Sequence, residues 1–311
     1  MRRLSMILAA TTALLAAHAE AKDLNRIGIS VGSLGNPFFV ALAKGATDKA
    51  KLINPNAEVT TVGYDYDLNK QLTQIDNFIA SGVDLILLNP GDPNAIEPAI
   101  KRAQAAGIIV VAVDTAAKDA DATVTTNNVQ AGELACQYIV DKLSGEGKVI
   151  IQNGPQVSAV IDRVNGCKSA LEKASGIELL SSDQDGKGSR DGGLSVGQGL
   201  LTRFDQVDAI FAINDPQALG TELAAKQLGR DKIIITSVDG APDIEDALKR
   251  SGSQLIQASA SQDPYSMAQL ATEIGFKLLN GERPEQAVTL IPSTLITQEN
   301  VGDYKGWTAT R

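Results

Sequence analysis

Short apolar runs alternate with amphipathic runs along almost the whole chain after residue 22. Two of the apolar runs, Val83–Leu88 and Ile108–Val113, are dominated by branched side chains, which is typical of strands buried on both faces of a parallel sheet. Between such runs, apolar positions recur at helical spacing. In Asp67–Ala80, for example, Leu68 and Leu72 share one face. The pattern therefore predicts alternating strands and helices.

The predicted elements form two successive series of alternating strands and helices, one in each half of the chain. The predicted strands are Arg26–Val31, Ala57–Tyr64, Val83–Leu88, Ile108–Val113, Lys148–Gln152, Ile177–Ser181, Ala209–Ile213, Ile233–Val238 and Leu255–Ala260. The predicted helices are Pro37–Ile53, Asp67–Ala80, Asn94–Ala106, Val129–Leu143, Ala159–Ala174, Arg190–Phe204, Pro216–Leu228, Ile244–Arg250 and Pro264–Asn280. We interpret Ala122–Thr126 as a crossing between the series and Thr289–Ile296 as extended. An α/β fold of two parallel-sheet lobes follows.

The loop after the first predicted strand is rich in candidate binding groups. Asn36 and Pro37 suit the start of a helix, as N-cap and first helical residue. Phe38 and Phe39 follow directly. Adjacent aromatics at the end of a strand pack into a core in most proteins. They can also form an aromatic platform at the mouth of a cleft, and the spacing leaves both interpretations open.

Polar side chains follow most of the other predicted strands. Taken singly, each is explained as an N-cap or a turn former. As a set, they would converge on one rim, where the carboxyl ends of parallel strands meet, and there they could bind a small polyhydroxylated ligand. The residues concerned are Asn89, Asp114, Thr115, Asn214, Asp215, Asp239, Ser261 and Gln262.

Arg163 is a further candidate, because a cation in the first turn of a helix opposes the helix dipole. A residue that is unfavourable there is expected to have another role. Its guanidinium can donate to two neighbouring hydroxyls at once.

The first 21 residues have the composition of an export signal. Arg2 and Arg3 precede an apolar run, Leu4–Ala17, and small-x-small cleavage patterns end at Ala21. This arrangement predicts a secretory signal peptide over residues 1–21 and a mature chain that begins at Lys22.

Composition excludes several classes of function. The formal net charge is −9 and the chain has no basic run, so nucleic-acid binding is not expected. The single histidine, His18, lies in the predicted signal peptide, which removes the commonest general base and metal ligand from the mature chain. The glycine-rich segments near Gly145 and Gly186 lack the spacing of phosphate-binding loops. We expect no metal and no cofactor.

The two cysteines, Cys136 and Cys167, each share a helical face with apolar residues. An exported chain meets oxidising conditions, in which such a pair can form a disulfide. Two buried free thiols fit the same pattern, and the sequence does not decide between them.

The residues at the strand ends resemble those of a known family. The motifs are Asn36-Pro37-Phe38-Phe39, Val113-Asp114, Asp162-Arg163-x-x-Gly166, Phe211-Ala-Ile-Asn214-Asp215, Val238-Asp239-Gly240-x-Pro242-Asp243 and Gln262. With these motifs in this order along the sequence, the chain resembles the periplasmic sugar-binding proteins of ABC importers, of the ribose- and galactose-binding type. The resemblance extends from Lys22 to Asn300.

The resemblance implies a type I periplasmic binding protein fold, with a hinge of three segments between two Rossmann-like lobes. The first lobe would comprise 22–126 with 263–292, and the second 127–262 with 293–311. A sugar would be held by Asn36, Phe38, Phe39, Asp114, Thr115, Arg163, Asn214, Asp239 and Gln262. The phenylalanines would stack on the sugar, the two aspartates would accept from its hydroxyls, and Arg163 would donate.

Two positions depart from the ribose-binding pattern. Thr115 stands where such sites carry an arginine, and Gly186–Ser189 stands where they carry an aromatic residue. A different pentose, a hexose or an open-chain polyol therefore fits at least as well as ribose.

The resemblance also implies the biological role. We expect a monomeric, non-enzymatic periplasmic protein that captures a monosaccharide or polyol by hinge closure and delivers it to a membrane ABC permease. A chemoreceptor is a second candidate partner. The alternatives are a binder of a non-sugar small molecule and, least favoured, a carbohydrate-active enzyme built on the carboxylate pair of Asp114 and Asp239.

Overall fold

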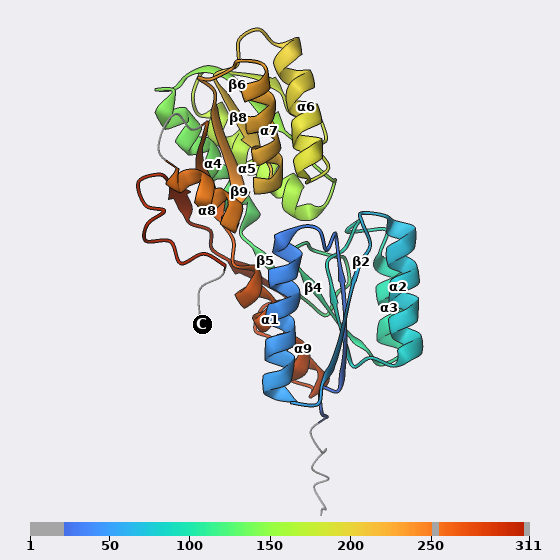
Figure 1. The fold of residues 1–311 in the computed structure, drawn as a ribbon. Coiled ribbons are helices and arrows are strands. Elements are labelled where there is room, and N and C mark those ends of the chain that lie inside the picture. The colour runs from blue at the N-terminus through green and yellow to red at the C-terminus, as the bar shows by residue number, and fades with distance from the viewer. Residues whose placement is uncertain (1–21, 251–254, 308–311) are drawn as a thin grey trace, which may run out of the picture.

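The structure is a computed structural model that describes residues 22–250 and 255–307. It consists of two α/β lobes placed end to end (Figure 1). The predicted signal peptide, 1–21, lies outside the described residues. In the part of the chain that is described, no helix is both long and apolar enough to cross a membrane.

The first lobe is a six-stranded sheet covered by helices on both faces. Its strand order is β11-β5-β4-β3-β1-β2, and every neighbouring pair is parallel. The strands are β1 (Arg26–Val31), β2 (Glu58–Gly63), β3 (Leu85–Leu88), β4 (Ile109–Val113), β5 (Ala122–Thr126) and β11 (Val288–Ile291). The helices are α1 (Pro37–Ile53) and α9 (Pro264–Leu279) on one face, and α2 (Leu68–Ser81) and α3 (Glu97–Ala105) on the other (Figure 1).

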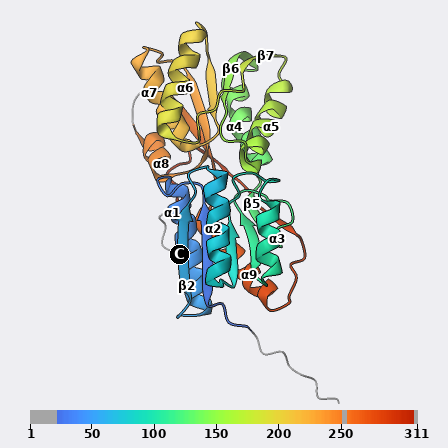
Figure 2. The ribbon, with the colours of Figure 1, turned by 90° about the vertical axis from the view of Figure 1, so that its right-hand side faces the viewer.

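The second lobe repeats this plan with the strand order β12-β10-β9-β8-β6-β7. Its strands are β6 (Glu146–Gln152), β7 (Gly176–Ser181), β8 (Ala209–Ala212), β9 (Ile234–Asp239), β10 (Ile256–Ser261) and β12 (Leu295–Thr297). Its helices are α4 (Asn128–Lys142) and α5 (Ser158–Glu172) on one face, and α6 (Arg190–Arg203), α7 (Asp215–Gln227) and α8 (Pro242–Lys249) on the other. The view in Figure 2 separates the α4–α5 pair from α6 and α7. Only β12 breaks the parallel pattern, because it pairs antiparallel with β10.

Two extended segments lie differently from the sequence prediction. Ala122–Thr126 is not a crossing but a buried strand, β5, which pairs with both β4 and β11. The extended stretch Thr289–Ile296 is divided between the two sheets, because β11 joins the first and β12 joins the second. The chain therefore crosses between the lobes just after β5, just after β10 and in the short segment 292–294.

The third helix begins later than its periodicity predicted. The Asp92 carboxylate accepts from the backbone N–H groups of Asn94 and Ala95, at 2.8 and 2.7 Å. This side-chain bonding forms a turn that precedes the helix. The helix α3 consequently starts at Glu97.

A disulfide joins α4 to α5 in the core of the second lobe. Cys136 and Cys167 are both fully buried, and their Cα atoms lie 5.0 Å apart. The helices approach closely because glycines face the neighbouring backbone: a Cβ on Gly132 would lie 2.0 Å from the carbonyl oxygen of Arg163. The question that the sequence left open is resolved in favour of the disulfide.

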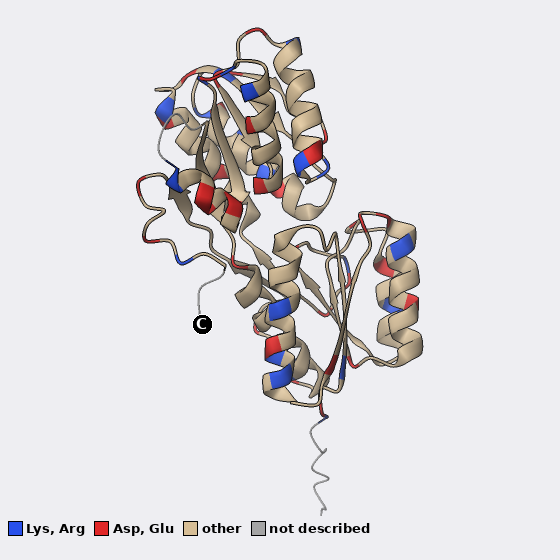
Figure 3. Ribbon diagram, viewed as in Figure 1, with Lys and Arg blue, Asp and Glu red and all other residues tan. Residues whose placement is uncertain are grey.

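The outer faces of the helices carry both signs of charge (Figure 3). Several opposite charges are paired one helical turn apart, as Glu273 and Lys277 are on α9, at 2.9 Å. Such exposed pairs each contribute a few tenths of a kcal/mol to helix stability. The charges that matter for the site are instead the buried ones at the strand ends.

Candidate functional site

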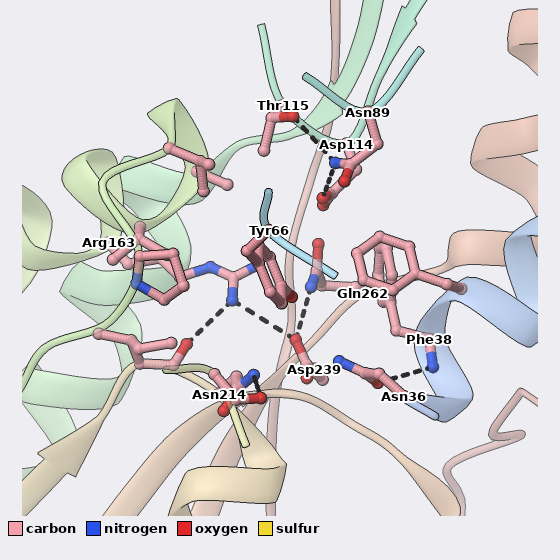
Figure 4. Close-up of a pocket in the computed structure, with 17 residues that line it drawn as sticks. Asn36, Phe38, Tyr66, Asn89, Asp114, Thr115, Arg163, Asn214, Asp239 and Gln262 are labelled. Atoms are coloured by element: carbon pink, nitrogen blue, oxygen red, sulfur yellow. Dashed lines mark hydrogen bonds and ion pairs between the residues drawn. The ribbon is translucent and has the colours of Figure 1, made fainter. Parts of the chain in front are cut away.

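A cavity between the lobes brings together all nine residues predicted to bind a ligand (Figure 4). The volume of this cavity is about 50 Å³. One water needs roughly 10–15 Å³ on this measure, so the cavity suits a small, compact ligand. The remaining lining residues are Tyr66, Asn89, Pro155, Val157, Ala159, Val160, Gly188 and Ile213.

The first helix of the first lobe supplies an amide and two aromatic rings. Asn36 is the N-cap of α1, since the backbone N–H of Phe38 donates to its side-chain oxygen at 3.0 Å, and Pro37 occupies the first helical position. The rings of Phe38 and Phe39 meet edge to face, with centroids 5.3 Å apart. Both side chains are buried in the core of the lobe and also line the cavity. The core interpretation is therefore confirmed for both rings, and their contact with a ligand stays a prediction.

Trp307 supports this aromatic pair from outside the cavity. Its ring lies edge to face against Phe38, at 5.8 Å between centroids, and its indole N–H donates to the backbone oxygen of Gln262 at 2.9 Å. The sequence prediction did not include Trp307. A buried tryptophan normally needs a partner for its N–H, but the identity of that partner depends on the tertiary fold.

At the end of β4, Asp114 and Thr115 are held by a neighbouring loop. The side-chain amide of Asn89 donates to the Asp114 carboxylate at 2.8 Å and to the Thr115 hydroxyl at 2.9 Å. The Thr115 hydroxyl in turn donates to the backbone oxygen of Pro90 at 3.3 Å. Burial raises the pKa of Asp114 to about 7, although the nearby Arg163 lowers it.

Arg163 is the cation of the site and is almost fully enclosed, with 5% of its surface exposed. Its Nε donates to the Asn128 side chain and its Nη1 to the backbone oxygen of Ile213, each at 2.9 Å. Nη1 also lies 3.5 Å from the Asp239 carboxylate. Because α5 begins at Ser158, Arg163 lies in the second turn and not in the first. The dipole argument for this residue was thus wrong, although its position at the cavity is as predicted.

Asp239, at the end of β9, belongs to a chain of hydrogen bonds that reaches the first lobe. The Gln262 side-chain amide donates to the Asp239 carboxylate at 2.7 Å, and the Thr126 hydroxyl donates to the Gln262 side-chain oxygen, also at 2.7 Å. Thr126 ends β5 and Gln262 follows β10, so this chain spans two of the three crossings. Movement of the lobes relative to each other would therefore change the hydrogen bonding of the Asp239 carboxylate.

Asp215 lies behind Asp239 and is completely buried. Its carboxylate accepts from the hydroxyls of Ser237 and Ser259, at 2.5 and 2.7 Å, and from the backbone N–H of Ala241 at 2.7 Å. Burial raises the pKa of both aspartates, and their mutual repulsion adds to the effect at Asp215.

The N-cap of α7 is Asn214 rather than Asp215. The side-chain oxygen of Asn214 accepts from the backbone N–H of Gln217 at 3.1 Å. Its amide nitrogen donates to the backbone oxygen of Gly188 at 3.0 Å. Asn214 is therefore both a cap and part of the cavity wall.

Tyr66 is a cavity residue that the sequence prediction missed. It follows β2 in a loop where Asp65 and Tyr66 both have positive φ, 53° and 59°, a backbone that non-glycine residues seldom adopt. Its ring points into the centre of the site (Figure 4), and its hydroxyl approaches Gly188 across the lobes. Although 38% of the surface of Tyr66 is exposed, the removal of water from around its hydroxyl raises the pKa of Tyr66, and the carboxylates of Asp114 and Asp239 raise it further, so the phenol stays protonated. Hydrophobic periodicity carries no signal for such a loop residue.

Comparison with known proteins identifies the family. A model of the periplasmic binding protein domain matches residues 27–283. The ribose import binding protein of Bacillus subtilis is 35% identical over 277 residues, which cover 88% of this chain and 87% of that protein.

Solved structures agree with the predicted fold. A solute-binding protein of an ABC transporter from Bacillus halodurans, with bound myo-inositol, matches with a TM-score of 0.82 and 27% identity over 91% of this chain and 97% of that one. One from Mycobacterium smegmatis, with bound glycerol, matches with a TM-score of 0.83 and 26% identity over 92% and 99%. The prediction of a type I periplasmic binding protein fold is confirmed, and the chain belongs to the periplasmic binding protein family.

Proposed function

We propose that this chain is a solute-binding protein that encloses a monosaccharide or polyol between its lobes and delivers it to an ABC permease. The observation that carries the proposal is the cavity itself, in which buried hydrogen-bonding groups from both lobes surround a space of small-molecule size. The bound ligands of the similar structures, myo-inositol and glycerol, are polyols, and the Bacillus subtilis relative is named for ribose.

The proposed site consists of the nine residues predicted from the sequence, together with Tyr66. Aromatic rings from α1 suit the C–H face of a sugar, and the carboxylates suit its hydroxyls. Micromolar binding needs about 8 kcal/mol of favourable free energy. A few hydrogen bonds to charged groups, at roughly 1.5–3 kcal/mol each, supply this after the cost of ordering the ligand.

Closure would take place about the three crossings, with the lobes composed of 22–126 and 263–292, and of 127–262 and 293–311. A ligand that contacts both lobes favours the closed state by the free energy of its contacts with the second lobe. The chain of hydrogen bonds from Thr126 through Gln262 to Asp239 couples the hinge to the ligand.

The family also supports a periplasmic location for this protein, which residues 1–21 would direct as a signal peptide. We propose a monomer that performs no chemical step, with the permease as partner and a chemoreceptor as a second candidate. Relatives with these folds are binding proteins rather than enzymes.

The first test is a thermal-shift screen of the chain from Lys22 against pentoses, hexoses and polyols. A ligand present at 100 times its Kd should stabilise the protein by about 2.7 kcal/mol, which is readily seen as a higher Tm. Asp239→Asn should abolish the shift, whereas Asp231→Asn, which changes an exposed carboxylate that precedes β9 and lies away from the cavity, should retain it. No shift with any ligand, from protein shown to be ligand-free, would overturn the proposal.

A further inference from the structure

The charges that line the cavity do not balance. Of the described residues that form its wall, three are charged, namely Asp114, Asp239 and Arg163. The single guanidinium lies against Asp239, at 3.5 Å, and its other hydrogen bonds go to Asn128 and Ile213. With both carboxylates ionised, the enclosed space carries a net charge of one negative unit.

The excess charge lies at Asp114. This side chain is buried, with 7% of its surface exposed, and within the described residues it forms no ion pair. Its side-chain partner is a neutral amide, that of Asn89. The next residue, Thr115, adds no charge, and its hydroxyl donates back to Pro90. A buried carboxylate without a neighbouring cation is unfavourable unless the carboxylate is protonated or a cationic group binds beside it.

The aromatic residues are placed to favour such a partner. Phe38, Phe39 and Tyr66 all line the same cavity as Asp114. The faces of aromatic rings attract ammonium groups, most strongly where water is excluded. A carboxylate and several aromatic rings around one enclosed space form an environment that is suited to a cation.

We propose that this cavity prefers a polyhydroxylated ligand that carries a basic nitrogen, an amino sugar or amino polyol, whose ammonium group lies beside Asp114. The inference rests on the proposed function and narrows its ligand class. The hydroxyls of such a ligand would engage Asp239, Arg163 and Asn214 as in a neutral sugar. The ammonium would donate to Asp114 and balance the charge of the cavity.

The test compares matched pairs of ligands by isothermal titration calorimetry at pH 7.5. Each pair consists of a neutral compound and its amino-deoxy counterpart: D-glucose and D-glucosamine, D-galactose and D-galactosamine, D-mannose and D-mannosamine, and sorbitol and 1-amino-1-deoxysorbitol. For at least one pair, the amine should bind about tenfold more tightly, because a charge-assisted hydrogen bond replaces a neutral one.

Two variants locate the effect. Asp114→Asn should bring the affinity ratio of amine to neutral compound to about one or below, and Thr115→Arg should lower it by adding a second cation. Asp231→Asn removes the same charge at an exposed position away from the cavity, before the start of β9, and should leave the ratio unchanged. Measuring a ratio separates the role of the charge from any general loss of binding, and the Tm of each variant reports whether it is folded.

Each outcome bears on one of the two proposals. If neutral compounds bind as tightly as every amine, the preference for a basic nitrogen is refuted while sugar or polyol binding stands. A preference that survives Asp114→Asn would refute the assignment to Asp114. If no compound of either kind binds, the proposed function itself fails.

Discussion

The backbone N–H of Ala116 donates to the side-chain hydroxyl of Ser158 at 2.7 Å, and this bond joins the two lobes. Ala116 follows β4 in the first lobe, and Ser158 is the first residue of α5 in the second. Ser158 does not line the cavity. In the proposed closure, this bond would stabilise the closed state without touching the ligand.

Ser158→Ala should weaken ligand binding by roughly two- to tenfold, because one hydrogen bond contributes about 0.5–1.5 kcal/mol to the closed state. The measurement is the Kd for the best ligand by calorimetry. Ser81→Ala is the matched control, since its hydroxyl donates to the Phe78 backbone oxygen within the first lobe. An unchanged Kd for Ser158→Ala would show that this bond does not contribute to closure.

Tyr66 should contribute through its ring more than through its hydroxyl. We expect Tyr66→Phe to weaken binding by up to about tenfold, the value of one hydrogen bond, and Tyr66→Ala to weaken it by roughly a hundredfold, because an aromatic wall is lost as well. Tyr138→Phe, on the half-buried face of α4, serves as the control. Wild-type affinity in Tyr66→Ala would remove Tyr66 from the site.

The buried Asp215 should make stability depend on pH. Burial raises its pKa in the folded chain, so the folded state keeps a proton that the unfolded state releases above about pH 4. The unfolded state then binds fewer protons, and stability falls as the pH rises. Asp215→Asn removes this ionisation. Urea unfolding from pH 4 to pH 8 should show the variant gaining stability relative to wild type by about 1.4 kcal/mol per unit of pKa difference. If the free energy of unfolding depends on pH in the same way for the variant and the wild type, the prediction is wrong.

The disulfide should stabilise the chain without shaping the site. Cys136 and Cys167 close a loop of 31 residues, for which the loss of chain entropy in the unfolded state predicts about 3–4 kcal/mol. Cys136→Ala with Cys167→Ala should lower the free energy of unfolding by that amount and leave the Kd within a few-fold, because neither residue lines the cavity. As a control, a reductant should lower the Tm of wild type but not of the double variant.

Trp307 offers an intrinsic optical signal for binding. It is the only tryptophan of the chain and packs against Phe38, which lines the cavity. A ligand that contacts the Phe38 ring should change the environment of the indole, and a titration should show a saturable change in fluorescence. Phe38→Leu should reduce the amplitude. A fluorescence that stays constant while calorimetry reports binding would show that Trp307 does not sense the ligand.

Much of the fold and of the site follows from local rules. Hydrophobic periodicity identifies the alternating elements because the inner strands, such as β3 and β8, are buried on both faces, while the helices bury one face against a sheet. The polar residues that directly follow strands, such as Asp114 and Asp239, come together because parallel strands end at the same edge. Their convergence on one cavity follows from topology.

The residues that sequence reasoning misplaced depend on non-local contacts. Tyr66 reaches the cavity through an unusual backbone conformation, and Trp307 packs against Phe38, outside the cavity, from a segment far along the chain. Arg163 is an exception: counted from the predicted start of its helix, Ala159, or from the observed start, Ser158, it lies beyond the first turn, so its assignment to the first turn was a miscount. Ala122–Thr126 resembles a linker in sequence, but two neighbouring strands make it part of a sheet.

The division of the final extended stretch between the sheets has a consequence for biosynthesis. The first lobe takes its edge strand, β11, and a core helix, α9, from residues that follow all but the last strand, β12, of the second lobe in the sequence. As the chain is synthesised, the second lobe can assemble nearly all of its strands while the first still lacks one face of its core. The lobe that begins the protein therefore completes its sheet only after five of the six strands of the second lobe have been made.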